Sequence, residues 1–233
     1  RVELTFDGIS YRADIWLNGQ QIASSEEHFG PFRQFSYDVT DVIAERNELT
    51  VKVYRWQKGE FNIGFVDWNP GPADESTGIF RPVWLRYSNE VSIKDPAVRS
   101  RLDTVDFDEA WLMVEATLSN ASDKEVSGKL CGKFENGSFA YPVTLAAGET
   151  RTVKVTSEEA RRLHVKNPRL WWCHNLGNPE MYSMDISFVA DGKVSDSHKV
   201  DFGIRQIGDW FNEDGYRGFI LNGKKVLIKG AGW

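Results

Sequence analysis

The chain of 233 residues is long enough for one large domain or two of ordinary size, and its composition, 41% hydrophobic and 27% charged, is typical of a globular protein with a buried core. The net charge of −6, without any basic run interleaved with aromatics, argues against a nucleic-acid partner. No apolar segment approaches the roughly 20 residues that span a bilayer, so we expect no membrane partner.

Alternating apolar and polar residues indicate β-strands in the first third of the chain. Residues 2–6 and 13–17 alternate, and the second run ends at Asn18-Gly19. This dipeptide predicts a hairpin, because a type I′ turn needs positive φ at both central residues. Further alternating stretches cover 32–39 and 48–56. The pattern predicts a half-buried sheet.

Two interruptions of this pattern are informative. Residues 41–46 are expected to form one helical turn capped by Thr40 or Asp41. The strand pattern resumes over 79–87, where the internal Pro82 indicates an edge strand or a bulge because proline cannot donate a ladder hydrogen bond.

Residues 65–76, FVDWNPGPADES, form a loop by composition, yet they carry a tryptophan and three carboxylates. Loops of this kind display binding residues on a rigid scaffold, so Asp67 and Trp68 are candidate site residues. Asp74 and Glu75 are expected to be solvated loop charges. Nothing in the spacing of Asp67 and Asp74 supports an acid–base pair.

A second series of strands follows a boundary near residues 88–95. About seven short strands with scarcely any helix predict a second β-sandwich. Asp191-Gly192 and Ala147-Gly148-Glu149 are expected turns, and 157–163 is expected to be one short helix capped by Ser157.

The remaining chemistry-bearing residues favour structural roles. Cys131 and Cys173 can form one bridge, but two buried free thiols are the favoured interpretation. The adjacent Trp171 and Trp172 should face opposite ways in a strand, with one in the core. No metal site and no cofactor are expected, because the histidines lack ligand spacing and are interpreted as surface or loop residues: His28, His164, His174 and His198.

Longer stretches resemble glycoside hydrolase family 2 over the whole chain and in the right order. FDGISYRADIWLNGQQIA (6–23), GPFRQFSYDVTDVI, NELTVKV and GIFRPVWL resemble its sugar-binding jelly-roll domain. NPRLWW (167–172), YSMDISF and FGIRQI (202–207) are similar to the immunoglobulin-like domain that follows. FILNGKKVLIKGAGW (219–233) resembles the start of the catalytic (β/α)8 barrel.

The resemblance implies an all-β fold class. A galactose-binding-like jelly roll is expected over 1–90, lacking its N-terminal strands, and an immunoglobulin-like sandwich over 91–204. Residues 205–233 are expected to be a linker and the first strand of a barrel whose remainder is missing.

Within the family, DWNPGPADESTGIFRP is most similar to the branch of β-mannosidases, exo-β-D-glucosaminidases and mannosylglycoprotein endo-β-mannosidases. There a DW…P loop reaches over the barrel mouth and helps form the terminal sugar subsite. The resemblance implies that Asp67 accepts hydrogen bonds from sugar hydroxyls and that Trp68 packs on a ring face. Trp233, after a Gly-rich strand end, is a candidate wall of the same site.

Each of these three residues also has a structural interpretation. Asp67 can be a turn-forming carboxylate, Trp68 a plug between loop and sheet, and Trp233 a core residue. Mannosidases usually show WDWGP, whereas here valine precedes Asp67 and asparagine follows Trp68. The difference favours glucosaminidase-like or endo-mannosidase-like enzymes.

The function implied is that of the non-catalytic N-terminal part of a retaining, exo-acting glycoside hydrolase that cleaves β-mannosides or β-glucosaminides. Such enzymes use two glutamates on barrel strands, about 5–5.5 Å apart. Those strands lie beyond Trp233, so no catalytic residue is assigned. The expected partners are a carbohydrate substrate and the chain's own barrel. The sequence does not determine the cellular compartment, although the resemblance slightly favours a periplasmic or secreted location.

Two other functions remain open. A stand-alone carbohydrate-binding module predicts sugar affinity for the chain by itself. A purely structural tandem of sandwiches predicts no ligand, and it leaves the loop that carries Asp67 and Trp68 unexplained.

Overall fold

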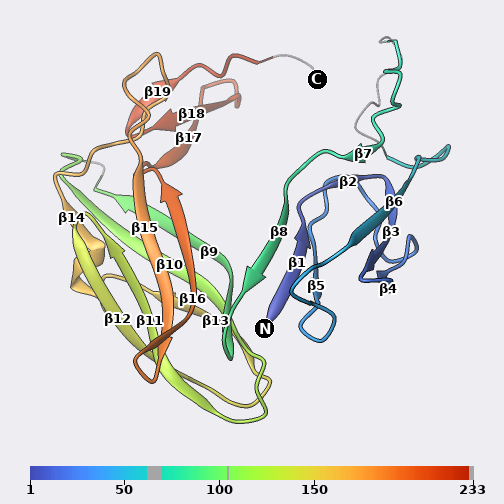
Figure 1. Cartoon of the computed structure of the whole chain (residues 1–233). Helices are drawn as coiled ribbons and strands as arrows, with labels where there is room; N and C mark the ends of the chain where they lie inside the picture. Colours follow the sequence, from blue (N-terminus) through green and yellow to red (C-terminus); the bar gives the residue numbers. More distant parts are fainter. Residues whose placement is uncertain (62–69, 104, 231–233) are drawn as a thin grey trace. The chain divides into compact units, whose positions relative to one another are not determined.

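A computed structural model describes residues 1–61, 70–103 and 105–230, and their regular structure is almost entirely β (Figure 1). The only helix in these ranges is the short 3-10 helix η1 (Arg161–Leu163). No helix in this part of the chain is long and apolar enough to cross a membrane. The chain divides into two compact units, Arg1–Ser88 and Asn89–Trp233.

Unit 1 contains three small antiparallel sheets, ordered β5-β1-β8, β4-β3-β6 and β2-β7. Their strands are β1 (Val2–Phe6), β2 (Ile9–Ser10), β3 (Arg12–Leu17), β4 (Gln20–Ala23), β5 (Phe35–Asp38), β6 (Leu49–Tyr54), β7 (Gly78–Ile79) and β8 (Val83–Tyr87). Alternate residues of β1 and β3 face the core, where Phe6, Ala13 and Ile15 are fully buried. Pro82 directly precedes β8, which pairs only with β1 among the described strands.

The hairpin predicted at Asn18-Gly19 is confirmed. Asn18 and Gly19 have φ of 53° and 79°, and they join β3 to β4. The side chain of Asn18 also donates to the Val42 carbonyl at 2.8 Å and accepts from the Glu48 amide at 2.9 Å. The turn therefore anchors a loop that lies far along the chain.

The helical turn predicted over 41–46 lies a few residues earlier, over 39–43. The described chain has a hydrogen-bonded turn there, in which the Ile43 amide donates to the Val39 carbonyl at 2.9 Å. Asp38, rather than Thr40 or Asp41, supplies the capping oxygen, accepting from the Thr40 amide at 3.1 Å and from its hydroxyl at 2.6 Å.

His28 corrects the expectation of surface histidines, because it is only 1% exposed in the core of unit 1. Its ring stacks on Phe35 with centroids 4.2 Å apart and meets Phe6 edge-on. Nδ1 lies 2.7 Å from the Tyr37 hydroxyl. Burial, and secondarily the charge of Arg33, lowers the pKa of His28 to about 4.

Unit 2 is a sandwich of two four-stranded antiparallel sheets. Its strands are β9 (Val91–Leu102), β10 (Glu109–Asn120), β11 (Val126–Phe134), β12 (Gly137–Leu145), β13 (Thr150–Val155), β14 (His164–Lys166), β15 (Tyr182–Ala190) and β16 (Lys193–Phe202). In one sheet β9 follows β10 along its length, while β13 and β14 share the other edge. The second sheet has the order β12-β11-β15-β16.

Side-chain hydrogen bonds link the two sheets at β9 and β16. The Ser195 hydroxyl accepts from the Val91 amide at 2.9 Å and donates to the Val91 carbonyl at 2.8 Å. Asp196 accepts from the Ile93 amide at 2.7 Å. These polar groups pair with backbone that no neighbouring strand reaches, which lets the sandwich close without orphaned amides at this corner.

The turns predicted at Asp191-Gly192 and around Gly148 are confirmed, with φ of 50°, 73° and 68° for Asp191, Gly192 and Gly148. The helix predicted over 157–163 is reduced to η1. η1 itself has no side-chain cap. The capping interaction belongs to the preceding turn and to Thr156, not Ser157, because Glu159 accepts from the Thr156 amide at 2.8 Å and from its hydroxyl at 2.6 Å.

A small third sheet, β17-β18-β19, follows the sandwich within unit 2. Its strands are β17 (Ile207–Phe211), β18 (Arg217–Leu221) and β19 (Lys224–Val226). The turn Asn222-Gly223, with φ of 46° and 76°, was readable as a hairpin but was missed. The predicted apolar strand ends at Val226 in the described chain, so the barrel-entry role of this segment remains a prediction.

The paired tryptophans and the cysteines also differ from expectation. Trp171 forms an isolated bridge with Pro179, and Trp172 lies in a loop, so neither is part of a strand. Both are half-buried, Trp171 against Gly203 and Trp172 against Gly177. Neither therefore belongs to the buried core. Cys131 and Cys173 are free thiols, as expected, but both are partly exposed.

Candidate functional site

The three residues predicted for the sugar site, Asp67, Trp68 and Trp233, all lie outside the described residues. Their roles therefore remain predictions. The residues on either side of Asp67 and Trp68 are described, and they show how the ends of this loop are held.

Asp67 and Trp68 belong to a longer segment, 55–75, which is called the loop from here on. Contacts of Glu75 join its two ends. The Arg55 Nε lies 2.8 Å from the Glu75 carboxylate, and the Trp56 indole donates to the Glu75 carbonyl at 3.1 Å. Arg55 and Trp56 directly follow β6, so the sheet fixes one end of the loop. Glu75 is thus a loop charge that stays 42% exposed, as expected, and that also forms an ion pair.

A tight turn shapes the second end of the loop. The Glu75 amide donates to the Pro72 carbonyl at 2.9 Å, and the Thr77 amide donates to the Asp74 backbone carbonyl at 3.0 Å. Asp74 also accepts from the Ser76 amide at 3.0 Å, as expected for an exposed loop carboxylate that stabilises its own turn. Glu75 and Ser76 have φ of 53° and 55°.

An open pocket lies beside the first end of the loop. Its lining includes two aromatic rings and several hydrogen-bond donors: Arg12, Ser25, Tyr54, Arg55, Trp56, Gln57 and Lys58. Rings with nearby amide and cationic donors are the groups from which a sugar-binding surface is built. Arg12 is held by an ion pair with Glu60.

Two of the lining residues, Ser25 and Tyr54, are hydrogen-bonded to Asp14. The Tyr54 hydroxyl donates to Asp14 at 2.6 Å, and the Ser25 amide donates to it at 2.7 Å. These bonds, that of Tyr54 first, hold the pKa of Asp14 below its usual value. Asp14 is therefore an ionised structural acceptor that orients Tyr54.

A cluster of exposed aromatics was missed from the sequence. Phe32 lies with its ring centroid 5.9 Å from that of Phe61 and 6.1 Å from that of Phe80, and the Arg81 guanidinium lies over both Phe32 and Phe80. Phe32 and Phe61 are 57% and 58% exposed, too much for core residues. Their neighbouring prolines and glycines were the available signal.

In the described ranges, no three His, Cys, Asp or Glu side chains are grouped so that they could hold a metal ion.

The comparisons with known proteins match the order of the two units. Residues 1–62 match the glycosyl hydrolase 2 galactose-binding domain-like model, and residues 91–205 match the glycosyl hydrolases family 2 model. The fold is therefore a galactose-binding-like sandwich followed by an immunoglobulin-like one.

Individual relatives match over the whole chain. An exo-β-D-glucosaminidase of Streptomyces avermitilis is 35% identical over 100% of this chain and 26% of its own length. A mannosylglycoprotein endo-β-mannosidase of Lilium longiflorum is 29% identical over 100% of this chain and 27% of its own. A solved complex of Amycolatopsis orientalis exo-chitosanase CsxA with PNP-β-D-glucosamine has 30% identity and a TM-score of 0.90, covering 100% of this chain and 27% of that one.

The chain spans about a quarter of the length of these relatives. Two matched models in the family's order and relatives that align over the full chain agree on one family. The chain belongs to glycosyl hydrolases family 2.

Proposed function

We propose that this chain is the non-catalytic N-terminal part of a retaining, exo-acting glycoside hydrolase. The observation that carries the proposal is the match of both units, in order, to exo-β-D-glucosaminidases over the full chain, at 35% identity to one and with a TM-score of 0.90 to the solved exo-chitosanase. The chain corresponds to only about a quarter of such enzymes, so the bond-breaking groups are assigned to the remaining part.

The substrate class we propose is terminal β-glucosaminides, with β-mannosides as the second choice. Identity to the exo-β-D-glucosaminidase of Streptomyces avermitilis is 35%, against 29% to the endo-β-mannosidase of Lilium longiflorum. The residues around Asp67 and Trp68 also depart from the WDWGP pattern of mannosidases.

In a retaining mechanism, one carboxylic acid protonates the leaving oxygen while a carboxylate about 5–5.5 Å away attacks the anomeric carbon. Neither group is assigned to this chain. The contribution that we assign to this chain is to hold the terminal sugar in position. Holding a reactant in a near-attack geometry lowers the barrier as effectively as a further chemical group.

The loop that contains Asp67 and Trp68 is the part of this chain that we propose to contact the sugar. Asp67 accepts hydrogen bonds from sugar hydroxyls, and Trp68 packs against a ring face; Trp233 forms a further wall. The contacts of Arg55 and Trp56 with Glu75 support this, because they join the loop's ends on the scaffold of β6.

The proposal is tested by joining this chain to the remaining three quarters of the Streptomyces avermitilis exo-β-D-glucosaminidase. We expect the chimera to hydrolyse an aryl β-glucosaminide. The catalytic part brings its own sugar preference, so the substrate class is tested on the full-length protein to which we assign this chain. That protein should cleave the aryl β-glucosaminide faster than the matching aryl β-mannoside, and the reverse preference would contradict the substrate class. A folded chimera that cleaves neither sugar would contradict the proposal itself.

The exposed aromatic cluster of Phe32, Phe61 and Phe80 favours one alternative, a stand-alone carbohydrate-binding module, because sugars stack on exposed rings. The alternative predicts saturable binding of chitosan or manno-oligosaccharides by the 233-residue chain, lost in Phe32→Ala. Our proposal predicts no saturable binding by the chain without the catalytic domain. A calorimetric titration separates the two.

A further inference from the structure

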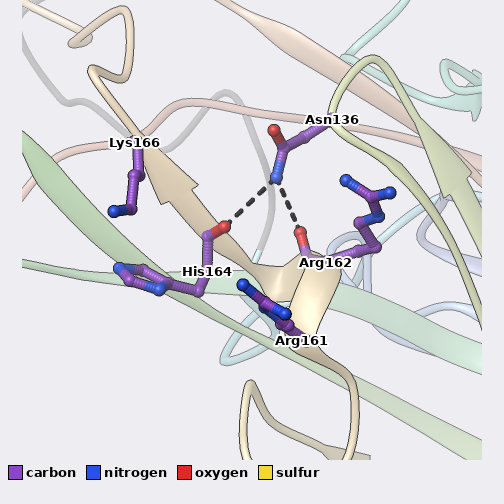
Figure 2. A pocket seen from close by; sticks show the side chains of 5 residues that line it. All are labelled: Asn136, Arg161, Arg162, His164 and Lys166. Carbon is purple, nitrogen blue, oxygen red and sulfur yellow. Dashed lines mark hydrogen bonds between the residues drawn. The ribbon is translucent and has the colours of Figure 1, made fainter.

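Basic and amide side chains gather around an open pocket in unit 2 (Figure 2). Its lining residues are Asn136, Arg161, Arg162, His164 and Lys166, and none of the described residues that line it is acidic. They come from the β11–β12 turn, from η1 and from β14. A local gathering of positive charge contrasts with the net charge of −6 for the chain.

Asn136 fixes the backbone from which the basic side chains project. Its Nδ2 donates to the carbonyls of Arg162 and His164, at 2.9 and 3.2 Å, as Figure 2 shows. Both side-chain donors of Asn136 are therefore used within the protein. They tie the β11–β12 turn to the segment that joins η1 and β14.

Gly137 lets the stem of Arg162 lie against the same turn. A Cβ at Gly137 would come within 2.9 Å of the Arg162 Cδ, and the φ of Gly137 is +126°. The positive φ favours glycine here, and the missing Cβ leaves room for the Arg162 stem. The close packing restricts the stem of Arg162 and so reduces the entropy lost when its guanidinium binds a ligand.

His164 and Lys166 form the wall on β14. The His164 ring stacks on Trp111 with centroids 5.2 Å apart and an angle of 5°. Its Nε2 lies 3.4 Å from Glu109 Oε1, and the Lys166 Nζ lies 3.9 Å from the same oxygen. Glu109 is thus the one carboxylate within 4 Å of these two groups in the described part of the chain.

Arg161 and Arg162 have no carboxylate within 4 Å among the described residues, and both are exposed. The single charge of Glu109 leaves the pocket with an excess of positive charge. Guanidinium groups present several donors in a planar fork that matches the oxygens of sulfate and phosphate. The pocket therefore has the positive charge and the hydrogen-bond donors that an anion-binding site needs.

We propose that this pocket binds a tetrahedral oxyanion, sulfate or phosphate, either free or as an ester on a saccharide. Arg161 and Arg162 donate charge-assisted hydrogen bonds to the oxyanion, and Lys166 contributes a point charge from β14. The donors come from η1 and β14 rather than from one plane, which suits a tetrahedral ligand better than a planar one. This assignment is independent of the proposed glycosidase function.

The test is a titration of the 233-residue chain followed by NMR of the arginine side chains, at constant ionic strength maintained with chloride. Inorganic sulfate is one ligand and glucosamine 6-sulfate is the other. We expect saturable shifts of the Arg161 and Arg162 Nε–H signals with both. Tighter binding of the sugar ester assigns the saccharide source, and equal or weaker binding assigns the free oxyanion.

The variant Arg161→Gln/Arg162→Gln should weaken sulfate binding at least about tenfold, because it removes the charge-assisted hydrogen bonds of both guanidinium groups to the oxyanion. The matched control, Lys193→Gln/Lys199→Gln, removes two exposed cations of β16 and should keep the affinity within about twofold. Both variants are checked for folding by their backbone amide spectra. Shifts that never saturate, or equal weakening in both variants, would overturn the proposal.

Discussion

The Arg55 Nε lies 2.8 Å from the Glu75 carboxylate, and this ion pair joins the two ends of the segment that carries Asp67 and Trp68. The Trp56 indole adds a hydrogen bond to the Glu75 carbonyl at 3.1 Å. A loop whose ends are joined on a strand loses less conformational entropy on binding than one with free ends. The ion pair is therefore the structural basis for expecting a positioned binding loop.

Replacing Glu75 with glutamine should loosen these ends without unfolding unit 1. Arg55 and Glu75 are 65% and 42% exposed, so the global free energy of unfolding should fall by less than about 1 kcal/mol. Locally, hydrogen exchange of the Trp56 indole N–H should become faster. Glu45→Gln, an exposed carboxylate elsewhere in unit 1, is the control. Unchanged exchange in Glu75→Gln would show that the ion pair does not hold the loop.

The buried His28 should make unit 1 sensitive to mild acid. Its pKa is lowered from 6.5 to about 4 in the folded protein, so between these values the unfolded state binds more protons. Stability is fully present above pH 6.5 and is lost as the pH falls towards 4, by roughly 3 kcal/mol in total.

Urea unfolding from pH 7 to pH 4 measures this loss. Carboxylates add their own acid sensitivity, so the informative quantity is the difference from His28→Gln, which should show a shallower slope between pH 6.5 and 4. His174→Gln, on an exposed loop, is the control and should keep the wild-type slope. Parallel curves for wild type and His28→Gln would contradict the predicted role of His28.

Gly132 on β11 is opposite Phe139 on β12, and a Cβ at this position would overlap the Phe139 ring. The substitution Gly132→Ala should destabilise unit 2 by about 1–3 kcal/mol, because a buried ring must move in a packed core. The control is Gly71→Ala, where a Cβ would meet no atom within 4 Å. Equal thermal stability of the two variants would mean that Phe139 moves without cost.

Asn120 is 1% exposed, and its side chain donates to the carbonyls of Lys124 and Ala146 at 2.8 and 2.9 Å. It also accepts from the Ser122 amide and hydroxyl. Asn120→Leu should therefore cost about 2–4 kcal/mol of unfolding free energy, because buried polar groups lose their partners. Asn120→Asp, which keeps only the acceptor role, should also destabilise unit 2. A stable Asn120→Leu in chemical denaturation would contradict this.

Local signals in the sequence predicted the all-β fold and several of its turns. Asn18-Gly19 and Asp191-Gly192 were readable because positive φ at two successive residues restricts the residue types. The same logic applied to Asn222-Gly223 and was overlooked. The predicted helical segments are displaced or shortened in the structure. Residues that cap helices also stabilise isolated turns, such as those that Asp38 and Thr156 form.

The site was less accessible to sequence reasoning. The ion pair of Arg55 with Glu75 and the burial of His28 beside Tyr37 depend on residues brought together by sheet pairing, which alternation does not specify. The basic pocket likewise joins Asn136 to a segment about 26 residues away in the chain. Asp67, Trp68 and Trp233 rest on the family resemblance, and they lie outside the described residues.

The most direct test of the central claim uses the chimera with the Streptomyces avermitilis catalytic part and compares Asp67→Ala with Asp74→Ala. Both substitutions remove a carboxylate from the same loop, and the Asp74 carboxylate accepts from the Ser76 amide of its own turn. We predict that Asp67→Ala lowers kcat/KM for an aryl β-glucosaminide about 10- to 100-fold with unchanged thermal stability, through lost charged hydrogen bonds to the sugar. Asp74→Ala should stay within about threefold. Full activity of Asp67→Ala would contradict the account, leaving Asp67 a turn residue and the chain a scaffold.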